Sequence, residues 1–169
     1  MEVTAPELPE ALFRTKKPGT LVIIQATLPR LRERRAGVIV TVTVTVTSSV
    51  TLKPLPLVGV YRASKAAVNA LTESLAVEAE PFGVRAHLVP PGRSPETRFG
   101  DTVRSHLRGL NVPDYAPLIQ GFAAAARNDA GPVTHAHDVA EAVWRAVTDP
   151  SAPFRIPAGA DADADAWMA

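Results

Sequence analysis

The apolar residues of the chain follow helical spacing in some segments and extended spacing in others. Between Thr20 and Arg35 they recur at intervals of three and four residues, which predicts a helix that Gly37 ends and Pro29 kinks. Further predicted helices span Tyr61 to about Glu80, Glu96 to Leu110, Pro117 to Arg127 and His137 to Val147, and predicted strands span Gly37 to Ser49, Val84 to Val89 and Phe154 to Ile156. Thr134 is expected to cap the last helix. This alternation predicts an α/β fold in which helices cover a parallel sheet.

A dipeptide repeat runs through the first predicted strand. Thr and Val alternate from Thr41 to Thr47, and β-branched residues of this kind favour extended structure. From Val38 to Thr51 the chain has neither proline nor charge. An exposed edge of this composition is a template for pairing with another chain.

The composition bounds the class of protein. The 169 residues suit about one domain, expected over 1–169, and 46% of them are hydrophobic, enough for a core. With 18 basic and 17 acidic residues, no net field recruits nucleic acid or an anionic membrane. The absence of cysteine excludes disulfides and thiolate metal sites. The acidic, proline-containing start differs from a signal peptide, and the longest apolar run is too short to span a bilayer, so we expect a cytoplasmic protein.

The acidic repeat near the C-terminus and the histidines before the last helix carry little chemistry. Residues 160–169 include Asp161, Asp163 and Asp165, which we interpret as part of a flexible, solvated tail. His135 and His137 fit an ordinary loop and first helical turn better than a metal site. We therefore expect no metal centre.

Tyr61 and Lys65 are the most informative pair in the chain. They stand four residues apart at the start of a predicted helix, so both side chains lie on one face. A free phenol titrates near ~10, and a nearby ammonium favours its ionised form, which would make Tyr61 a usable acid or base. Chance matches to this spacing are common, so its surroundings matter.

The order of elements around this pair resembles the short-chain dehydrogenase/reductase family. Ser48 and Ser49 end a strand, the Tyr61 helix follows, and the next strand ends at Pro91-Gly92; the segment from Gly37 to Phe99 carries the resemblance.

The resemblance implies a role for each of these residues. The serine would hold the oxygen of a small carbonyl or alcohol substrate, and Tyr61 would transfer the proton. Tyr61 and Lys65 would bind the cofactor, with Lys65 on the nicotinamide ribose, and Lys65 would lower the tyrosine pKa. Pro91 and Gly92 would lie against the nicotinamide. The spacing leaves the serine open between Ser49 and Ser48, and its place at the strand end favours Ser49.

Two features depart from the family pattern. The chain has no glycine-rich turn: its first glycine, Gly19, precedes an apolar helix. The resemblance therefore implies a partial Rossmann-like three-layer fold whose N-terminal strands are missing, with NAD or NADP bound weakly or not at all. The catalytic asparagine of the family falls on Lys16, in a predicted loop.

Two functions follow from these observations. The first is an NAD(P)-dependent oxidoreductase; the second is a non-catalytic truncated remnant that acts as an association module. Family members pair through the Tyr-x-x-x-Lys helix and the helix before it, and Ala66, Ala67, Ala70 and Ala76 give the first of these a small-residue face. We therefore expect a homo-oligomer formed through the Tyr61 helix and its neighbour.

Overall fold

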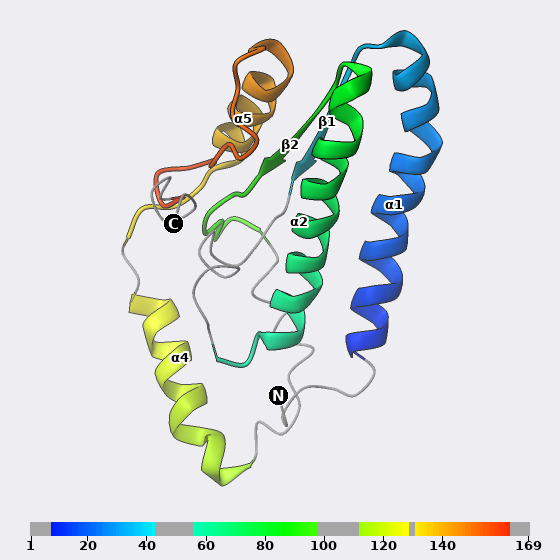
Figure 1. The fold of residues 1–169 in the computed structure, drawn as a ribbon. Coiled ribbons are helices and arrows are strands. Elements are labelled where there is room, and N and C mark those ends of the chain that lie inside the picture. The colour runs from blue at the N-terminus through cyan, green and yellow to red at the C-terminus, as the bar shows by residue number, and fades with distance from the viewer. Residues whose placement is uncertain (1–7, 43–55, 98–111, 129–130, 163–169) are drawn as a thin grey trace.

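The computed structural model describes residues 8–42, 56–97, 112–128 and 131–162 (Figure 1). In chain order its elements are helix α1 (Leu8–Arg34), strand β1 (Gly37–Val42), helix α2 (Gly59–Ala79), the short 3-10 helix η2 (Glu80–Phe82), strand β2 (Val84–Val89), the 3-10 helix η3 (Pro113–Tyr115), helix α4 (Ala116–Asn128) and helix α5 (Ala136–Thr148). The predicted alternation of helices and strands is therefore present. Among the helices within these ranges, none is both long and apolar enough to cross a membrane.

The two strands pair in parallel. Gly37 faces Val84 at one end of the ladder, and Val42 faces Val89 at the other. On its other side β2 pairs through isolated parallel bridges from Leu88 to Arg155 and from Pro91 to Ala158. β2 is therefore central, whereas β1 has a single strand partner within the described ranges.

The strand predictions agree with this sheet in different degrees. Val84 to Val89 is confirmed, and the strand that was predicted from Gly37 is present as far as Val42. Its remainder, residues 43–49, lies outside the described residues, as does most of the valine and threonine repeat. Phe154 to Ile156 forms one isolated bridge to β2, from Arg155 to Leu88, rather than a regular strand.

Helices cover both faces of the sheet. One apolar cluster joins Ile24 of α1 and Leu75 of α2 to Ala86 of β2, and a second joins Val89 of β2 to Ala146 of α5. Because successive strand residues point to opposite faces, these two clusters lie on opposite sides of β2. Figure 1 shows the same arrangement, with α1 and α2 on one side and α5 on the other.

α1 is longer than predicted. It begins at Leu8 rather than near Thr20, and it continues through Pro18 and Pro29. The preceding segment is rich in Leu, Ala, Glu, Arg and Lys, which favour helix by intrinsic propensity without an apolar period. Lys16 therefore lies within a helix, and the prediction of a loop there is wrong.

Two predictions in the second half of the chain are corrected as well. His135 is the N-cap residue of α5, and its N–H donates to Asp138 Oδ2 at 2.7 Å, so Thr134 is not the cap. The helix that was predicted from Glu96 begins instead as a turn, in which Thr97 N donates to Ser94 O at 3.1 Å. Residues 98–110 of that prediction lie outside the described residues.

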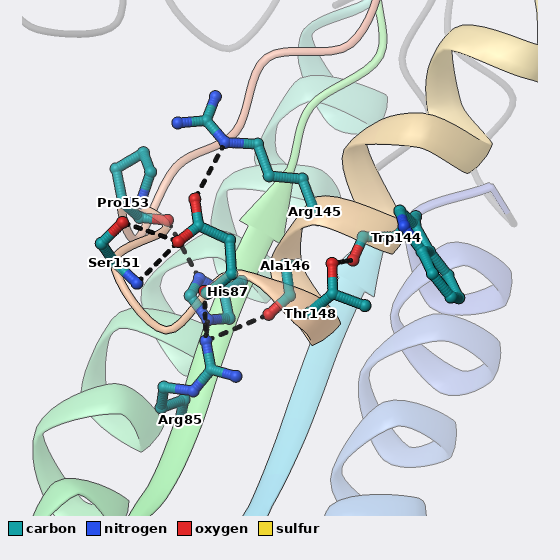
Figure 2. A network of polar contacts seen from close by, with 9 residues as sticks. Arg85, His87, Trp144, Arg145, Ala146, Thr148, Ser151 and Pro153 are labelled. Atoms are coloured by element: carbon teal, nitrogen blue, oxygen red, sulfur yellow. Dashed lines mark hydrogen bonds and ion pairs between the residues drawn. The ribbon is translucent and has the colours of Figure 1, made fainter.

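Arg85 ties β2 to the C-terminal end of α5 (Figure 2). Its guanidinium donates to three main-chain carbonyls there, those of Ala146 at 3.2 Å, Val147 at 3.1 Å and Asp149 at 2.9 Å. The last carbonyls of a helix have no partner inside the helix, and a cation suits that end of its dipole. Arg85 of the central strand therefore holds α5 on the face of the sheet opposite α1 and α2.

His87 extends this network into the loop after α5. It is buried, its Nδ1 lies 2.9 Å from Pro153 O, and its Nε2 lies 3.3 Å from Arg85 Nη1. A carbonyl accepts and a guanidinium donates, so the neutral tautomer protonated at Nδ1 satisfies both contacts.

We expect Arg85→Met to destabilise the fold, because three carbonyls lose a charged donor while the aliphatic stem is kept. The free energy of unfolding in urea should fall by about 2 kcal/mol or more. Arg30→Met, at an exposed position of α1, is the matched control and should change it little. Equal stability of the two variants would show that the Arg85 contacts add no net stability.

Candidate active site

Tyr61 and Lys65 lie together near the start of α2. Lys65 is buried, and its Nζ is 5.6 Å from the centroid of the Tyr61 ring. An ammonium at this distance over an aromatic face is attracted by the negative face of the ring. The structure therefore brings together the two side chains that the sequence spacing placed on one face.

The electrostatics of Tyr61 differ from the expectation. Burial raises the pKa of the phenol above its ordinary value of 10.0, because the charged form would lose its hydration. Lys65 was expected to lower this pKa; the pKa of Tyr61 instead lies above its ordinary value, and burial of the phenol is the cause.

The pair stands at the carboxyl edge of the sheet. Thr72, two turns further along α2, donates from Oγ1 to Thr41 Oγ1 at 3.2 Å near the end of β1. α2 runs antiparallel to the strands, so its first turns lie beyond their carboxyl ends (Figure 1). Ligands of open parallel sheets bind at this edge.

Pro91 and Gly92 continue β2 into the same edge. Pro90, Pro91 and Gly92 are all buried, and Gly92 N donates to Thr134 Oγ1 at 2.8 Å and to Ala158 O at 3.2 Å. The turn is therefore anchored by two segments that follow it by more than forty residues.

Thr134 and Asp161 hold this turn, and neither residue was predicted to contact it. Thr134 was expected to be a helix cap, and Asp161 part of a solvated tail. Instead Thr134 is buried, and Asp161 accepts hydrogen bonds from Thr134 Oγ1 and from the Arg93 N–H. No local pattern could reveal these contacts, because the partners are 27 and 68 residues apart.

The two candidate serines, Ser48 and Ser49, lie outside the described residues, so the choice between them stays a prediction. Within the described ranges, no group of three or more histidine, cysteine, aspartate or glutamate side chains is arranged to hold a metal ion.

The groups that would hold the nicotinamide ribose of a dinucleotide are the Tyr61 hydroxyl and the Lys65 ammonium, which lie together at the start of α2. The Pro91-Gly92 turn follows β2 at the same edge of the sheet. The diphosphate end has no counterpart in the sequence, since no glycine-rich turn occurs in it. The fit therefore concerns one half of such a ligand.

Comparison with protein families and with curated proteins gives consistent matches. A family profile described as short chain dehydrogenase matches residues 2–107. The 3-ketodihydrosphingosine reductase of Bacteroides thetaiotaomicron is 32% identical over 143 residues, which cover 83% of this chain and 51% of that protein. An uncharacterized oxidoreductase of Schizosaccharomyces pombe is 28% identical over 164 residues, 94% of this chain and 64% of its own length. The chain thus spans about half the length of the curated relatives it matches.

Solved structures agree on the fold. A short-chain dehydrogenase from Streptomyces avermitilis matches with a TM-score of 0.73 at 24% identity, covering 99% of this chain and 58% of that one. A short chain dehydrogenase from Burkholderia cenocepacia, in complex with NADP, matches with a TM-score of 0.61 at 23% identity, covering 94% of this chain and 52% of that one. The predicted partial α/β, Rossmann-like fold is therefore confirmed.

The raised pKa of Tyr61 is directly measurable, because Tyr61 and Tyr115 are the two tyrosines of the chain. In Tyr115→Phe, the ultraviolet absorbance of tyrosinate should appear only well above pH 10, since the remaining phenol is desolvated. The unfolded phenol ionises near ~10, so Tyr61 should also make the folded state lose stability as pH rises past that value.

Tyr61→Phe is the matched comparison. It should remove the loss of folding stability that Tyr61 causes above pH 10. The tyrosinate absorbance of this variant comes from Tyr115 alone. Half-ionisation of Tyr61 at or below pH 10 in the folded Tyr115→Phe protein would show that Lys65 outweighs burial.

Proposed function

Since this chain belongs to the short-chain dehydrogenase/reductase family, we propose that it is an NAD(P)-dependent oxidoreductase that acts on the carbonyl or hydroxyl group of a small molecule. The observation that supports this most is the buried Lys65 ammonium beside the Tyr61 ring, at the carboxyl edge of the sheet and on the same edge as the Pro91-Gly92 turn.

In this proposal Tyr61 is the proton donor for carbonyl reduction. A phenol is fully protonated at neutral pH, so Tyr61 can give its proton to the substrate oxygen as negative charge develops there. Burial raises the pKa of Tyr61 and makes it a weaker acid, which the nearby Lys65 ammonium would offset. A reduced nicotinamide, when bound, would supply the hydride to the carbonyl carbon and become oxidised. The substrate would then be an alcohol, and the phenolate left on Tyr61 would regain its proton from solvent before the next turnover.

Lys65 has two tasks in the same step. Its ammonium lies close enough to Tyr61 to offset the negative charge left on the phenol after proton transfer. It also has hydrogens to donate to a ribose hydroxyl, which would orient the nucleotide against Pro91 and Gly92. Ser49, or alternatively Ser48, would hold the substrate oxygen near Tyr61.

The name of one relative supports a carbonyl substrate. That protein is called a 3-ketodihydrosphingosine reductase, and it shares 32% identity with this chain over 143 residues. We take from it the class of reaction, reduction of a carbonyl to an alcohol, as part of this proposal.

Turnover tests the role of Tyr61. Oxidation of NADPH and NADH is followed by absorbance with a panel of ketones and aldehydes. Tyr61→Phe keeps the ring and removes the acid, so the rate should fall by about 10²- to 10⁴-fold, and Lys65→Ala should be similarly harmful. Tyr115→Phe is the matched control and should retain activity. A Tyr61→Phe protein at full rate would contradict the proposed mechanism.

A second candidate, a non-catalytic association module, is favoured by the lack of a glycine-rich turn in the sequence. Without diphosphate contacts, the dissociation constant for NAD and NADP should be no tighter than about millimolar, because each tenfold loss in affinity corresponds to ~1.4 kcal/mol. Calorimetric titration with both nucleotides separates the candidates. A micromolar constant would exclude the second.

We further propose that the chain forms a homo-oligomer through α1 and α2. These helices pack together on one side of the sheet, and they expose Val22 (58%), Ile23 (67%) and Val77 (72%). Isolated exposed apolar residues are common, but several on adjacent helices are typical of an interface.

Light scattering tests this interface. The wild-type chain should be dimeric or larger, and Ile23→Glu combined with Val77→Glu should shift it toward monomer, because the charges cannot be desolvated in an apolar contact. The matched control is Trp144→Glu on α5, which is 70% exposed on the opposite side of the sheet and should leave the assembly unchanged. An unchanged mass in the double variant would place the interface elsewhere.

A further inference from the structure

The carboxylate of Asp161 lies against the turn that follows β2. Its Oδ2 accepts a hydrogen bond from the Arg93 N–H, and its Oδ1 accepts one from Thr134 Oγ1 at 2.6 Å. Thr134 in turn accepts from Gly92 N at 2.8 Å, and Thr134 N donates to Arg93 O at 2.8 Å. Two successive N–H groups of the turn are thus held, one by the carboxylate and one by a hydroxyl bound to it.

The same carboxylate limits which residue can occupy position 92. A Cβ placed on Gly92 would lie 2.0 Å from Asp161 Oδ1 and 2.2 Å from its Cγ, far inside van der Waals contact. The positive-φ glycines in the described ranges are Gly83 and Gly159, so the backbone of Gly92 has a conformation open to other residues. Gly92 therefore has to be glycine because Asp161 occupies the space, rather than because of its φ angle.

We infer that Asp161 is a positioning residue, which acts through Thr134 and the Arg93 N–H to hold the Pro91–Gly92–Arg93 turn in one conformation at the carboxyl edge of the sheet. That this turn receives a nicotinamide rests on the proposed function. The geometry of the turn itself does not depend on it.

The two acceptor oxygens that are needed here explain why residue 161 is an aspartate. A carboxylate accepts on both oxygens, which matches an N–H on one side and a hydroxyl on the other. An asparagine keeps the shape and one acceptor oxygen for the Arg93 N–H, and Thr134 can rotate its proton to Ala158 O, which lies 2.9 Å away. Alanine keeps neither contact and empties the space beside Gly92.

Hydrogen exchange of single amides tests the positioning. In the full chain, Asp161→Ala should raise the exchange rate of the Arg93 amide by about tenfold or more, since its acceptor is gone. Asp161→Asn should restore most of the protection. Asp149→Ala is the matched control, because that carboxylate also holds a turn, through Ser151 N and Oγ, away from Gly92. Equal Arg93 exchange in the Asp161→Ala and Asp149→Ala proteins would overturn the inference.

A double-mutant cycle tests the shared space. Gly92→Ala should raise the unfolding equilibrium constant by about tenfold or more in the wild-type and Asp161→Asn backgrounds, where the carboxyl or amide group blocks the new methyl. In the Asp161→Ala background, the same change should raise it by no more than about twofold, since the obstruction is absent. An equal penalty in all three backgrounds would show that Asp161 does not determine residue 92.

Nucleotide kinetics links the turn to function. Asp161→Ala should raise the KM for NADPH or NADH by about tenfold with a smaller change in kcat, whereas Asp149→Ala should change neither. An unchanged nucleotide KM, together with faster Arg93 exchange, would show that Asp161 stabilises the turn without positioning it for a nucleotide. If the wild-type chain binds neither nucleotide, the proposed function fails, and the exchange and stability measurements still decide whether Asp161 holds the turn.

Discussion

The burial of β2 between two helical layers is the constraint on which the rest of the structure depends. Its residues and the Pro90-Pro91-Gly92 segment that follows are buried almost throughout, and it is bonded to β1 on one side and to residues 154–158 on the other. A strand buried on both faces needs partners in both directions: Val84, Ala86 and Leu88 supply apolar side chains on one face, and Val89 with the hydrogen-bonded Arg85 and His87 fills the other. α2 and α5 then take their places on its two faces.

Two polar anchors attach the C-terminal part of the chain to this strand. Arg85 and His87 bind the end of α5 and the loop after it, and Thr134 and Asp161 bind the turn beyond the strand. Buried polar groups need partners, so each anchor specifies one arrangement of its segments rather than adding general cohesion. The second anchor, Thr134 and Asp161, lies at the edge of the sheet where the candidate active site is found, so the same contacts stabilise the fold and hold a turn of that site.

The surroundings of Tyr61 show an opposition between burial and acid–base chemistry. The same packing that places Lys65 beside the ring also removes water from the phenol, and this burial raises the pKa of Tyr61 above its ordinary value. A protonated phenol suits the donation of a proton to a carbonyl oxygen. Removal of a proton from an alcohol would need the phenolate form of Tyr61, which burial disfavours.

The sequence by itself determined the features that depend on local spacing. Tyr61 and Lys65 are neighbours because a helix brings residues four apart together. Val84 to Val89 is a strand because its apolar residues alternate with Arg85 and His87, and the segment is bounded by Gly83 and by prolines. The order of these elements was enough to indicate the family and the fold. The first turns of α1, from Leu8 onward, were not predicted, because that segment favours helix by residue type but has no helical spacing of apolar residues.

Only the tertiary structure decided what depends on contacts between distant segments. The pKa of Tyr61 follows from burial by several elements, which no local pattern encodes. The roles of Thr134 and Asp161 arise because α5 brings the chain back to β2, so residues far apart in sequence meet at one turn. Hydrogen bonds and desolvation act over a few ångströms in space, whereas sequence patterns report only neighbours along the chain. That is why the proximity of Tyr61 and Lys65 could be predicted, and the burial of the phenol and the contacts that hold the turn could not.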